Sequence, residues 1–492
     1  MLNHVSLGIH PNHASFDPMT ALSRLKAQAD WVALRYVNEK THSRSFKNGK
    51  SESHSVSFDR GVMVEVFVNG YFGYAGTSDL SDAGLLKALL KAKEVAAFAS
   101  ARGISEFTLE QRPVAQGEYQ SPFFQNLDGA SLAEFCETLR LATEKMKVSE
   151  KIVTTRANAR IIETHQVYVS SHGTNVDQKY LMIATDFKAT AKEGSETQSR
   201  SDKGGLARCN QMGLEALDRR EVLARCEQIG REALELLAAP NCPTDTRDLI
   251  LAPDHMLIQI HESIGHPLEI DRILGDERNY AGWSFVKPSD FGKLQYGSKL
   301  MNVTFDPAVP GEFASYAFDD CGNPATREYL IKDGLLVRGL GSLESQKRSG
   351  IPGVANFRSA SWNRAPIDRM ANINLEPGTS SLAEMIARTE RGIYIQSNQS
   401  WSIDDYRNKF QFGAEYAQLI ENGKITTVVK NPNYRGITVP FWNSLKAVGN
   451  AEDVEMYGSP YCGKGEPSQV IRVGHSSPHC LFSQIEIFGG GH

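Results

Sequence analysis

Residues 254–275 (DHMLIQIHESIGHPLEIDRILG) constrain the fold of this chain most strongly, because an apolar, helix-like run contains His261 and His266 five positions apart. In a regular α-helix that interval rotates the second side chain about 140° from the first, so the two imidazoles would point in different directions. Gly265 tolerates unusual backbone angles, and Pro267 disfavours the α conformation at His266. The segment therefore predicts a helix that is kinked, or that contains a π-bulge, between the two histidines.

The same segment indicates a metal site. Glu262 directly follows His261 among aliphatic residues, and a buried acid is unfavourable unless a cation lies nearby. Paired histidines with an adjacent glutamate are typical of zinc peptidases, in which the acid activates water. Glu269 and Asp271 follow as residues that either orient the histidines or are surface loop residues or salt-bridge partners. The alternative interpretation is a buried helix whose histidines are hydrogen-bonded in the core.

A catalytic zinc site usually has three protein ligands and one open position, so a third ligand must come from another part of the chain. Cys462 is the best candidate, because it lies in the Gly- and Pro-rich segment GSPYCGKGEPSQ, which we expect to form a turn. The residue types leave alternatives open, and the competing candidates in GHSSPHC are His475, His479 and Cys480.

The first half of the chain predicts helices packed on an antiparallel sheet. Apolar periodicity and capping residues indicate helices at 20–29, 79–101, 131–146 and 219–239. Alternating patterns indicate strands at 33–36, 61–76 and 152–191, with Asn69-Gly70 as a hairpin turn and a break at 171–173. The polar tract after residue 191 is expected to be a mobile loop. A boundary near the two prolines of 240–245 separates an N-terminal α+β domain (1–240) from a C-terminal domain (241–492).

The C-terminal domain is expected to be mostly β and to carry the kinked metal-binding helix, so that the chain as a whole belongs to the α+β class. The expected strands cover 302–305, 327–338, 392–396, 409–420 and 469–473. The expected helices cover 256–265, 382–389 and 439–448.

Charge and cysteine usage exclude several classes of protein. The 53 basic residues against 58 acidic ones give a net charge of −5, which disfavours a nucleic-acid-binding protein. The first residues lack the pattern of an export signal, and no apolar run is long enough to cross a membrane. The seven cysteines contain no C-x-x-C pair, so we expect free thiols and a reducing, cytoplasmic location.

Two segments some 200 residues apart, HESIGHPLEIDR and YCGKG, resemble the TldD/PmbA family of metallopeptidases, on the TldD side. The resemblance extends to GVMVEVFVNGYFGYAGTSDLS, DDCGNPATREYLIKDGLL and FQFGAEYAQLIENGKI, and so covers nearly the whole chain. It implies zinc ligands at His261, His266 and Cys462, with Glu262 as the catalytic acid/base. It also implies a homodimer, or a heterodimer with a PmbA-like subunit, whose chamber admits unfolded or small peptides. The chain departs from the family at Pro267, where glycine is expected.

Two other functions have some support in the sequence, and a third has little. GSPYCGKG nearly matches a nucleotide-binding phosphate loop, but Gly465 stands where Ser or Thr would bind magnesium. A non-enzymatic partner or scaffold subunit with a structural metal would need a fourth ligand, such as His475 or His479. A serine hydrolase is disfavoured because the sequence contains no G-x-S-x-G motif.

Overall fold

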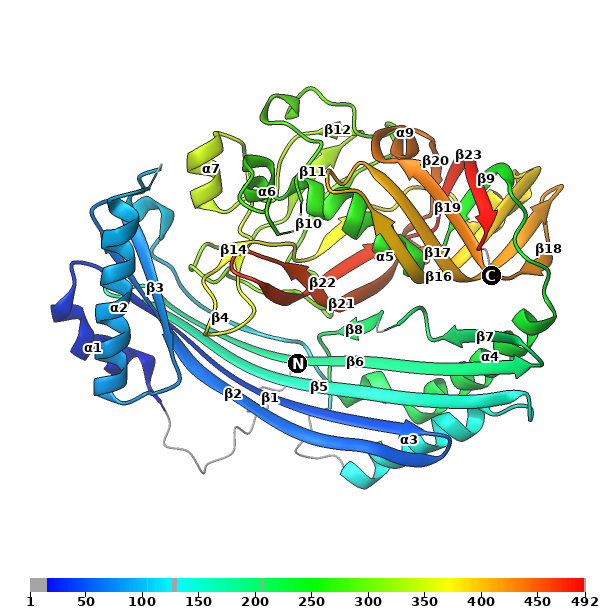
Figure 1. Ribbon diagram of the computed structural model, residues 1–492, viewed down its shortest axis with the longest axis horizontal. Helices are drawn as coiled ribbons and strands as arrows, with labels where there is room; N and C mark the ends of the chain where they lie inside the picture. Colours follow the sequence, from blue (N-terminus) through cyan, green and yellow to red (C-terminus); the bar gives the residue numbers. More distant parts are fainter. Residues whose placement is uncertain (1–15, 104, 126–130, 206, 281, 491–492) are drawn as a thin grey trace.

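The chain has an α+β fold, as predicted, and an eight-stranded sheet forms the body of its N-terminal half. The computed structural model describes residues 16–103, 105–125, 131–205, 207–280 and 282–490, so the expected absence of an export signal in residues 1–15 lies outside the described part. The long strands run side by side across the lower part of Figure 1. Their order is β3-β2-β1-β5-β6-β4, with β7 and β8 also pairing with β6.

The strands of this sheet are β1 (Val32–Lys47), β2 (Lys50–Val68), β3 (Tyr71–Thr77), β4 (Gln116–Gln120), β5 (Ile152–Ser170), β6 (Asn175–Glu193), β7 (Glu196–Ser201) and β8 (Arg208–Asn210). The hairpin predicted at Asn69-Gly70 is confirmed, because both residues have positive φ (49° and 86°), as a two-residue turn between antiparallel strands requires. The sheet is not wholly antiparallel as expected, since β4 pairs with β6 in parallel.

The prediction of a mobile loop after residue 191 is wrong. β7 lies within that tract and pairs antiparallel with β6 from Lys188 to Glu193. β7 lies at an edge of the sheet. Strand pairing uses backbone groups, so the polar side chains of β7 do not prevent it from joining the sheet.

Helices cover both ends of the sheet. α1 (Pro18–Leu25) and α2 (Asp82–Ser100) lie at the left end of Figure 1, and α3 (Leu132–Met146) and α4 (Arg219–Ala238) lie toward the other end. α2 begins at Ser81, whose side chain accepts a hydrogen bond from the Gly84 amide (3.1 Å) and so caps the helix. Separate apolar clusters lie under α2 and under α3 with α4.

The C-terminal half contains a closed sheet. β16 pairs with β9 on one side and with β17 on the other, so the order β16-β9-β23-β19-β17 returns to its starting strand. β18 and β20 attach to this ring through β17 and β23. The strands are β9 (Asp245–Leu251), β16 (Arg391–Ile403), β17 (Lys409–Glu421), β18 (Lys424–Val429), β19 (Pro432–Ile437), β20 (Leu445–Val448) and β23 (Cys480–Gly489).

Smaller sheets and helices complete this half. A four-stranded sheet contains β10 (Val303–Phe305), β11 (Glu328–Lys332), β12 (Leu335–Leu336) and β15 (Ile373–Leu375). Two separate hairpins are formed by β13 (Phe357–Arg358) with β14 (Ile367–Asp368), and by β21 (Glu455–Lys464) with β22 (Gln469–Ser477). The helices are α5 (Pro253–Ile260), α6 (Ile270–Leu274), α7 (Leu343–Ser349), α8 (Leu382–Ala387) and α9 (Thr438–Asn443). The helix predicted at 439–448 is therefore correct only in its first part, because the rest is β20.

Short 3₁₀ segments connect several of these elements, at Lys26–Gln28, Leu109–Gln111, Leu214–Leu217, His266–Leu268, Pro288–Asp290 and Ala451–Asp453.

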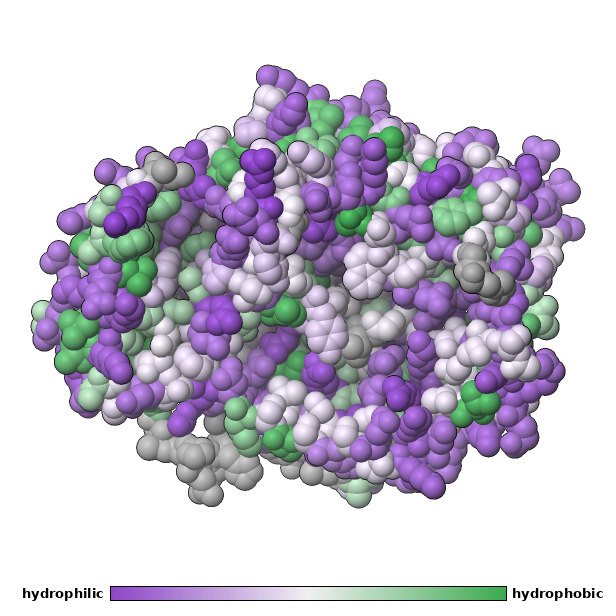
Figure 2. Space-filling model, in the orientation of Figure 1, coloured by the Kyte–Doolittle hydropathy of each residue, from purple (hydrophilic) through white to green (hydrophobic). Residues whose placement is uncertain are grey.

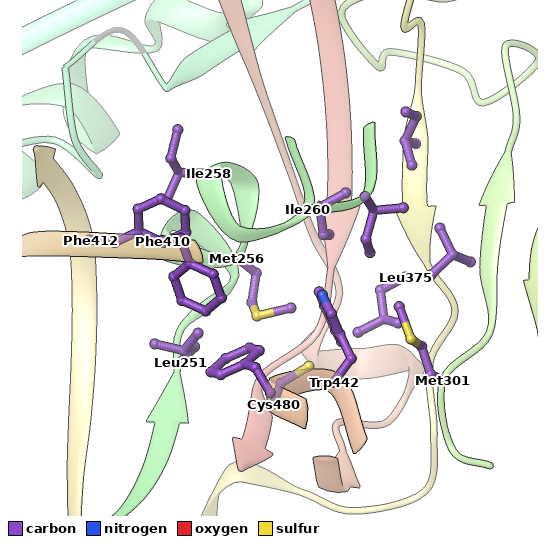
Figure 3. Packing of buried hydrophobic residues seen from close by; sticks show 14 of the residues in the cluster. Leu251, Met256, Ile258, Ile260, Met301, Leu375, Phe410, Phe412, Trp442 and Cys480 are labelled. Carbon is purple, nitrogen blue, oxygen red and sulfur yellow. The ribbon is translucent and has the colours of Figure 1, made fainter. Parts of the chain in front are cut away.

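α5 is buried at the centre of the C-terminal half. Figure 3 shows Met256, Ile258 and Ile260 of this helix among apolar side chains from the surrounding elements, including Leu251 of β9, Phe410 of β17 and Trp442 of α9. All six side chains are buried. This packing restrains the helix on every side, and so it also fixes the position of the His261–Gly265 segment that continues from its last residue.

Ion pairs join the two halves. Arg112 binds Glu344 (2.6 Å), Arg472 binds Glu39 (2.7 Å) and Arg200 binds Glu415 (3.1 Å). On the face seen in Figure 2, hydrophilic side chains predominate and apolar ones are scattered among them, as expected where most large apolar residues are in the interior. In the described part of the chain, no helix is both long and apolar enough to cross a membrane.

Candidate metal centre

The distortion predicted between the two histidines is present. α5 ends at Ile260, and His261–Gly265 form a π-helical turn that continues into a 3₁₀ turn at His266–Leu268. A Cβ atom on Gly265 would lie 2.0 Å from the sulfur of Met370, so glycine is required here by close packing and not by a positive φ. The irregular helix brings the rings of His261 and His266 to a centroid distance of 4.8 Å.

Cys462 completes a buried group with these histidines. One ligand atom from each of His261, His266 and Cys462 lies within 4.8 Å of the others. The Cys462 sulfur is 3.9 Å from Nε2 of His266, whereas two such atoms bound to one tetrahedral zinc ion would be about 3.6 Å apart. The three residues therefore fit a single zinc ion with a small adjustment.

The prediction that Cys462 lies in a turn is wrong. Cys462 lies in strand β21 and pairs with Ile471 of β22, next to an irregularity in register between Ser459 and Cys462. Pro460 within that irregularity is compatible with a strand because a bulged position needs no ladder hydrogen bond. The thiol is thus held by a hairpin and not by a loop.

Hydrogen bonds define which nitrogen each imidazole turns toward the thiol. The Ile373 carbonyl can only accept, so Nδ1 of His475 carries a proton (3.0 Å), and the other nitrogen of a neutral His475 accepts from Nδ1 of His261 (2.9 Å). The Nδ1 of His266 donates to Glu269 (3.0 Å). Both metal-site histidines therefore present an unprotonated Nε2, the form that binds a cation.

Burial favours the same protonation states. It lowers the pKa of His261 and of His266 below the usual 6.5, against the opposing effect of nearby carboxylates. Burial also opposes the thiolate of Cys462, but the charge of Arg369 and the contact with His266 outweigh it, so the pKa of Cys462 is lowered. Neutral imidazoles and a thiolate are the states that zinc ligands require.

Glu262 lies beside this group and is nearly buried (5% exposed). Its Oε2 atom accepts a hydrogen bond from Nη1 of Arg407 at 2.8 Å. A glutamate next to a metal-ligating histidine has the residue type and the position of a general base. The structure therefore places each of the four residues singled out in the sequence in one small region.

The other candidates have different roles. Glu269 orients His266, as one of the two interpretations predicted, whereas Asp271 accepts two hydrogen bonds from Lys464 (2.6 and 2.8 Å). His479 is hydrogen-bonded to Tyr394 (3.0 Å), and Cys480 lies beside its own Pro478 carbonyl. Within the described residues, the His261, His266 and Cys462 group includes none of the competing candidates.

The phosphate-loop resemblance of GSPYCGKG is not reflected in the structure. The segment lies in β21 except for its last residue, and Lys464 is fully buried (0% exposed), with its ammonium bound to Asp271. A phosphate-binding lysine must instead reach into an open loop at the start of a helix.

Sequence reasoning missed two arginines and the role of His475. Arg369 is fully buried and donates to the Cys462 carbonyl, and its Nε and Nη1 atoms have no hydrogen-bond partner among the described residues. Arg407 contacts Glu262 across 145 positions of the chain. The sequence carries no local signal for either contact, because both depend on strand pairings between distant segments.

Comparisons with known proteins identify the family of the chain. Residues 244–489 match the model of the PmbA/TldA metallopeptidase C-terminal domain, and residues 32–96 match that of domain 1. A metalloprotease from Methanocaldococcus jannaschii is 27% identical over 92% of this chain and 96% of its own length. A zinc metalloprotease TldD homolog from Saccharolobus solfataricus is 26% identical over 49% of this chain and 51% of its own length.

A solved structure shows the same fold. TldE from Thermococcus kodakarensis aligns with 96% of this chain and all (100%) of its own, with a TM-score of 0.73 and 16% sequence identity. The matches to the family models extend over more than half of the sequence and include both the histidine helix and the cysteine hairpin. The chain is therefore a member of the TldD/PmbA family of metallopeptidases.

Proposed function

We propose that this chain is a zinc-dependent peptidase in which His261, His266 and Cys462 hold the metal and Glu262 is the catalytic base. The observation that carries the proposal is the buried group of two unprotonated imidazole nitrogens and one thiol beside a carboxylate. The donor set supports zinc, because imidazole and thiolate ligands suit this borderline-soft ion. The name of the Saccharolobus solfataricus relative also supports zinc.

The mechanism is hydrolysis of a peptide bond. Zinc bound in such a site supplies Lewis-acid polarisation of the scissile carbonyl and makes water more acidic. Glu262 accepts the proton of the attacking water and returns it to the leaving amine. His475 and Glu269 keep His261 and His266 in the orientation that ligation requires.

We infer that the substrates are unfolded or small peptides. The small C-terminal sheets that stay open outside the closed ring support this inference, because the edge of an open sheet binds an extended peptide through its main chain and so accepts many sequences. Cleavage of an unfolded protein should therefore be much faster than cleavage of the same protein in its folded state. Equal rates for the two states would contradict this substrate class.

We also propose a dimer that encloses a chamber, formed either by two copies or with a PmbA-like subunit. The fold shared with TldE makes a subunit of similar fold a candidate partner. We further propose two domains, at 1–240 and 241–492. The apolar clusters under α2 and under α3 with α4 support this division, because they contain only residues of the first segment. Among the described residues the seven cysteines form no disulfide, which supports a reducing compartment such as the cytoplasm.

A scaffold subunit with a structural metal is the second candidate. Structural zinc sites commonly have four protein ligands. The buried His475, which contacts His261, is the candidate for the fourth ligand. Its two nitrogens are instead hydrogen-bonded to His261 and Ile373. The count of three candidate ligands favours the peptidase, and X-ray absorption of the zinc-loaded protein would distinguish three protein ligands from four.

The decisive variant for catalysis is Glu262→Gln, which preserves the shape of the side chain and removes its basicity. We expect unchanged zinc content and loss of hydrolysis of an unfolded casein substrate. Glu344→Gln is the matched control, because Glu344 also binds an arginine (Arg112, 2.6 Å) but lies in a different region. Full activity of Glu262→Gln would contradict the proposed mechanism.

A further inference from the structure

The turn between β16 and β17 has an unusual backbone at Arg407. Its φ of 61° lies in the left-handed region, which is unfavourable for a residue with a side chain by roughly 1 kcal/mol. The turn is nevertheless well held, because the Arg407 amide donates to the Asp404 carbonyl (2.9 Å) and the Thr438 hydroxyl donates to the Arg407 carbonyl (3.2 Å). Strain that the surroundings maintain in this way is concentrated at functional positions.

A second segment holds the same turn from outside. The amides of Trp283 and Phe285 donate to the carbonyls of Asp405 and Tyr406, at 2.6 and 2.8 Å. The Tyr406 side chain is 53% exposed and stacks against Trp283, with ring centroids 6.1 Å apart. The neighbouring Arg407 side chain is only 15% exposed. The turn therefore sends two consecutive side chains in different directions, one toward solvent and one into the metal centre.

Arg407 ends at the carboxylate of Glu262. Nη1 of Arg407 lies 2.8 Å from Oε2 of Glu262, whose side chain is 7% exposed. A glutamate side chain has three rotatable bonds, and an ion pair with a fixed guanidinium selects one of its orientations. Arg407 contacts Glu262 and is absent from the candidate ligand group, so it would act on the site by holding this carboxylate, in addition to the direct effect of its charge on His261.

We propose that Arg407 is a positioning residue for Glu262, and that the left-handed backbone of the turn places its guanidinium against that carboxylate. The inference rests on the proposed peptidase function. The competing explanation is a structural one, in which Arg407 only neutralises a buried acid. The two explanations differ in what they predict for the turnover of a variant that remains folded.

Arg407→Gly is the informative variant, because glycine accepts the left-handed backbone while the guanidinium is removed. It is compared with wild type after zinc loading, on unfolded casein, at a temperature where thermal melts show both proteins folded. We expect kcat to fall about 100-fold with KM changed by less than about threefold, as for a misplaced catalytic group. Zinc content should equal that of wild type.

Three further measurements separate positioning from structure. Guanidinium ion at millimolar concentration should restore part of the kcat of Arg407→Gly, without changing its melting temperature. Arg407→Lys should retain more activity than Arg407→Gly, because it keeps the charge but not the fixed fork of donors. Asp333→Gly is the matched control, since Asp333 also has a left-handed backbone (φ 49°) in an exposed turn, and this variant should keep wild-type kcat.

The outcomes are distinct. A folded Arg407→Gly variant with kcat within about threefold of wild type would overturn the positioning role and leave the peptidase proposal intact. Loss of kcat that guanidinium does not restore, together with loss of zinc, would assign Arg407 a structural role. Absence of peptide hydrolysis by zinc-loaded wild type would overturn the proposed function itself, and the positioning role with it.

Discussion

Nε2 of His475 lies 2.9 Å from Nδ1 of His261, and this contact ties the orientation of one metal-site imidazole to strand β22. A second hydrogen bond runs from His475 to the Ile373 carbonyl on β15. A π-helical turn alone would leave His261 free to rotate about its side-chain bonds. The two strands supply the constraint that the helix does not.

The first prediction concerns His475→Phe. The substitution removes the acceptor for Nδ1 of His261 while keeping a ring of similar size, so His261 can change tautomer and orientation. We expect zinc affinity to fall by about 10- to 100-fold, as for other partners that orient a ligand. Competition with a chromophoric chelator measures this affinity.

His479→Phe is the control for that experiment, because His479 is also buried but is hydrogen-bonded to Tyr394, outside the metal centre. Its zinc affinity should match wild type. Wild-type affinity in the His475→Phe variant would show that the hydrogen bond to His261 has no role in metal binding.

The second prediction concerns acid stability. His255 is fully buried, and burial lowers its pKa from 6.5 to about 4. His255 binds a proton more tightly in the unfolded chain than in the folded protein. The stability that the folded protein has while His255 is neutral is therefore complete above pH 6.5 and is lost as the pH falls toward 4. That shift corresponds to about 3 kcal/mol of unfolding free energy.

When the pH is lowered from 6.5 to 4, the free energy of unfolding of His255→Phe should therefore fall by about 3 kcal/mol less than that of wild type. Urea unfolding of both proteins across this range, with a chelator present, provides the comparison. Because all other titrating groups are shared, parallel pH profiles for the two proteins would rule out His255 as a source of acid sensitivity.

The third prediction concerns the packing that permits the π-helical turn. A methyl group at Gly265 would lie 2.0 Å from the Met370 sulfur, so Gly265→Ala should lower stability by about 1–3 kcal/mol through overpacking. The double variant Gly265→Ala with Met370→Ala should lose less than the sum of the single losses, because the smaller side chain makes room.

Gly463→Ala serves as the control for that series. Gly463 is next to Cys462, but no atom lies within 4 Å of a Cβ built on it. Thermal unfolding should show little change for this variant. A Gly265→Ala protein as stable as wild type would mean that close contact with Met370 does not restrict this position.

Local features of the sequence predicted the helix distortion and failed at the cysteine. The five-residue interval between His261 and His266 requires an irregular helix if both side chains are to reach one ion. The irregularity is present, but Gly265 is required by packing against Met370, and His266 keeps helical angles (φ −61°, ψ −41°) despite Pro267. Cys462 was expected in a turn because its neighbours are glycine and proline. It lies in β21 because pairing with β22 overrides that composition, and the register irregularity after Ser459 accommodates Pro460.

Contacts between distant segments were beyond prediction for the same reason. His475 and Arg407 reach the metal centre from β22 and from the β16–β17 turn, and the positions of both depend on how the strands pair. The alternation of apolar residues indicates that a segment is a strand, but not which strand lies beside it. The family resemblance favoured Cys462 where the residue pattern alone left His475, His479 and Cys480 in competition, and the structure groups Cys462 with the two histidines.

The central claim is that His261, His266 and Cys462 hold one metal ion, and zinc analysis of purified variants tests it most directly. Zinc content is measured for wild type and for His261→Ala, His266→Ala and Cys462→Ala, with Cys480→Ala as a control for loss of a buried thiol outside the group. We predict about one zinc per chain in wild type and in Cys480→Ala, and loss of zinc in the other three variants. Retention of zinc by a folded Cys462→Ala variant would contradict the account.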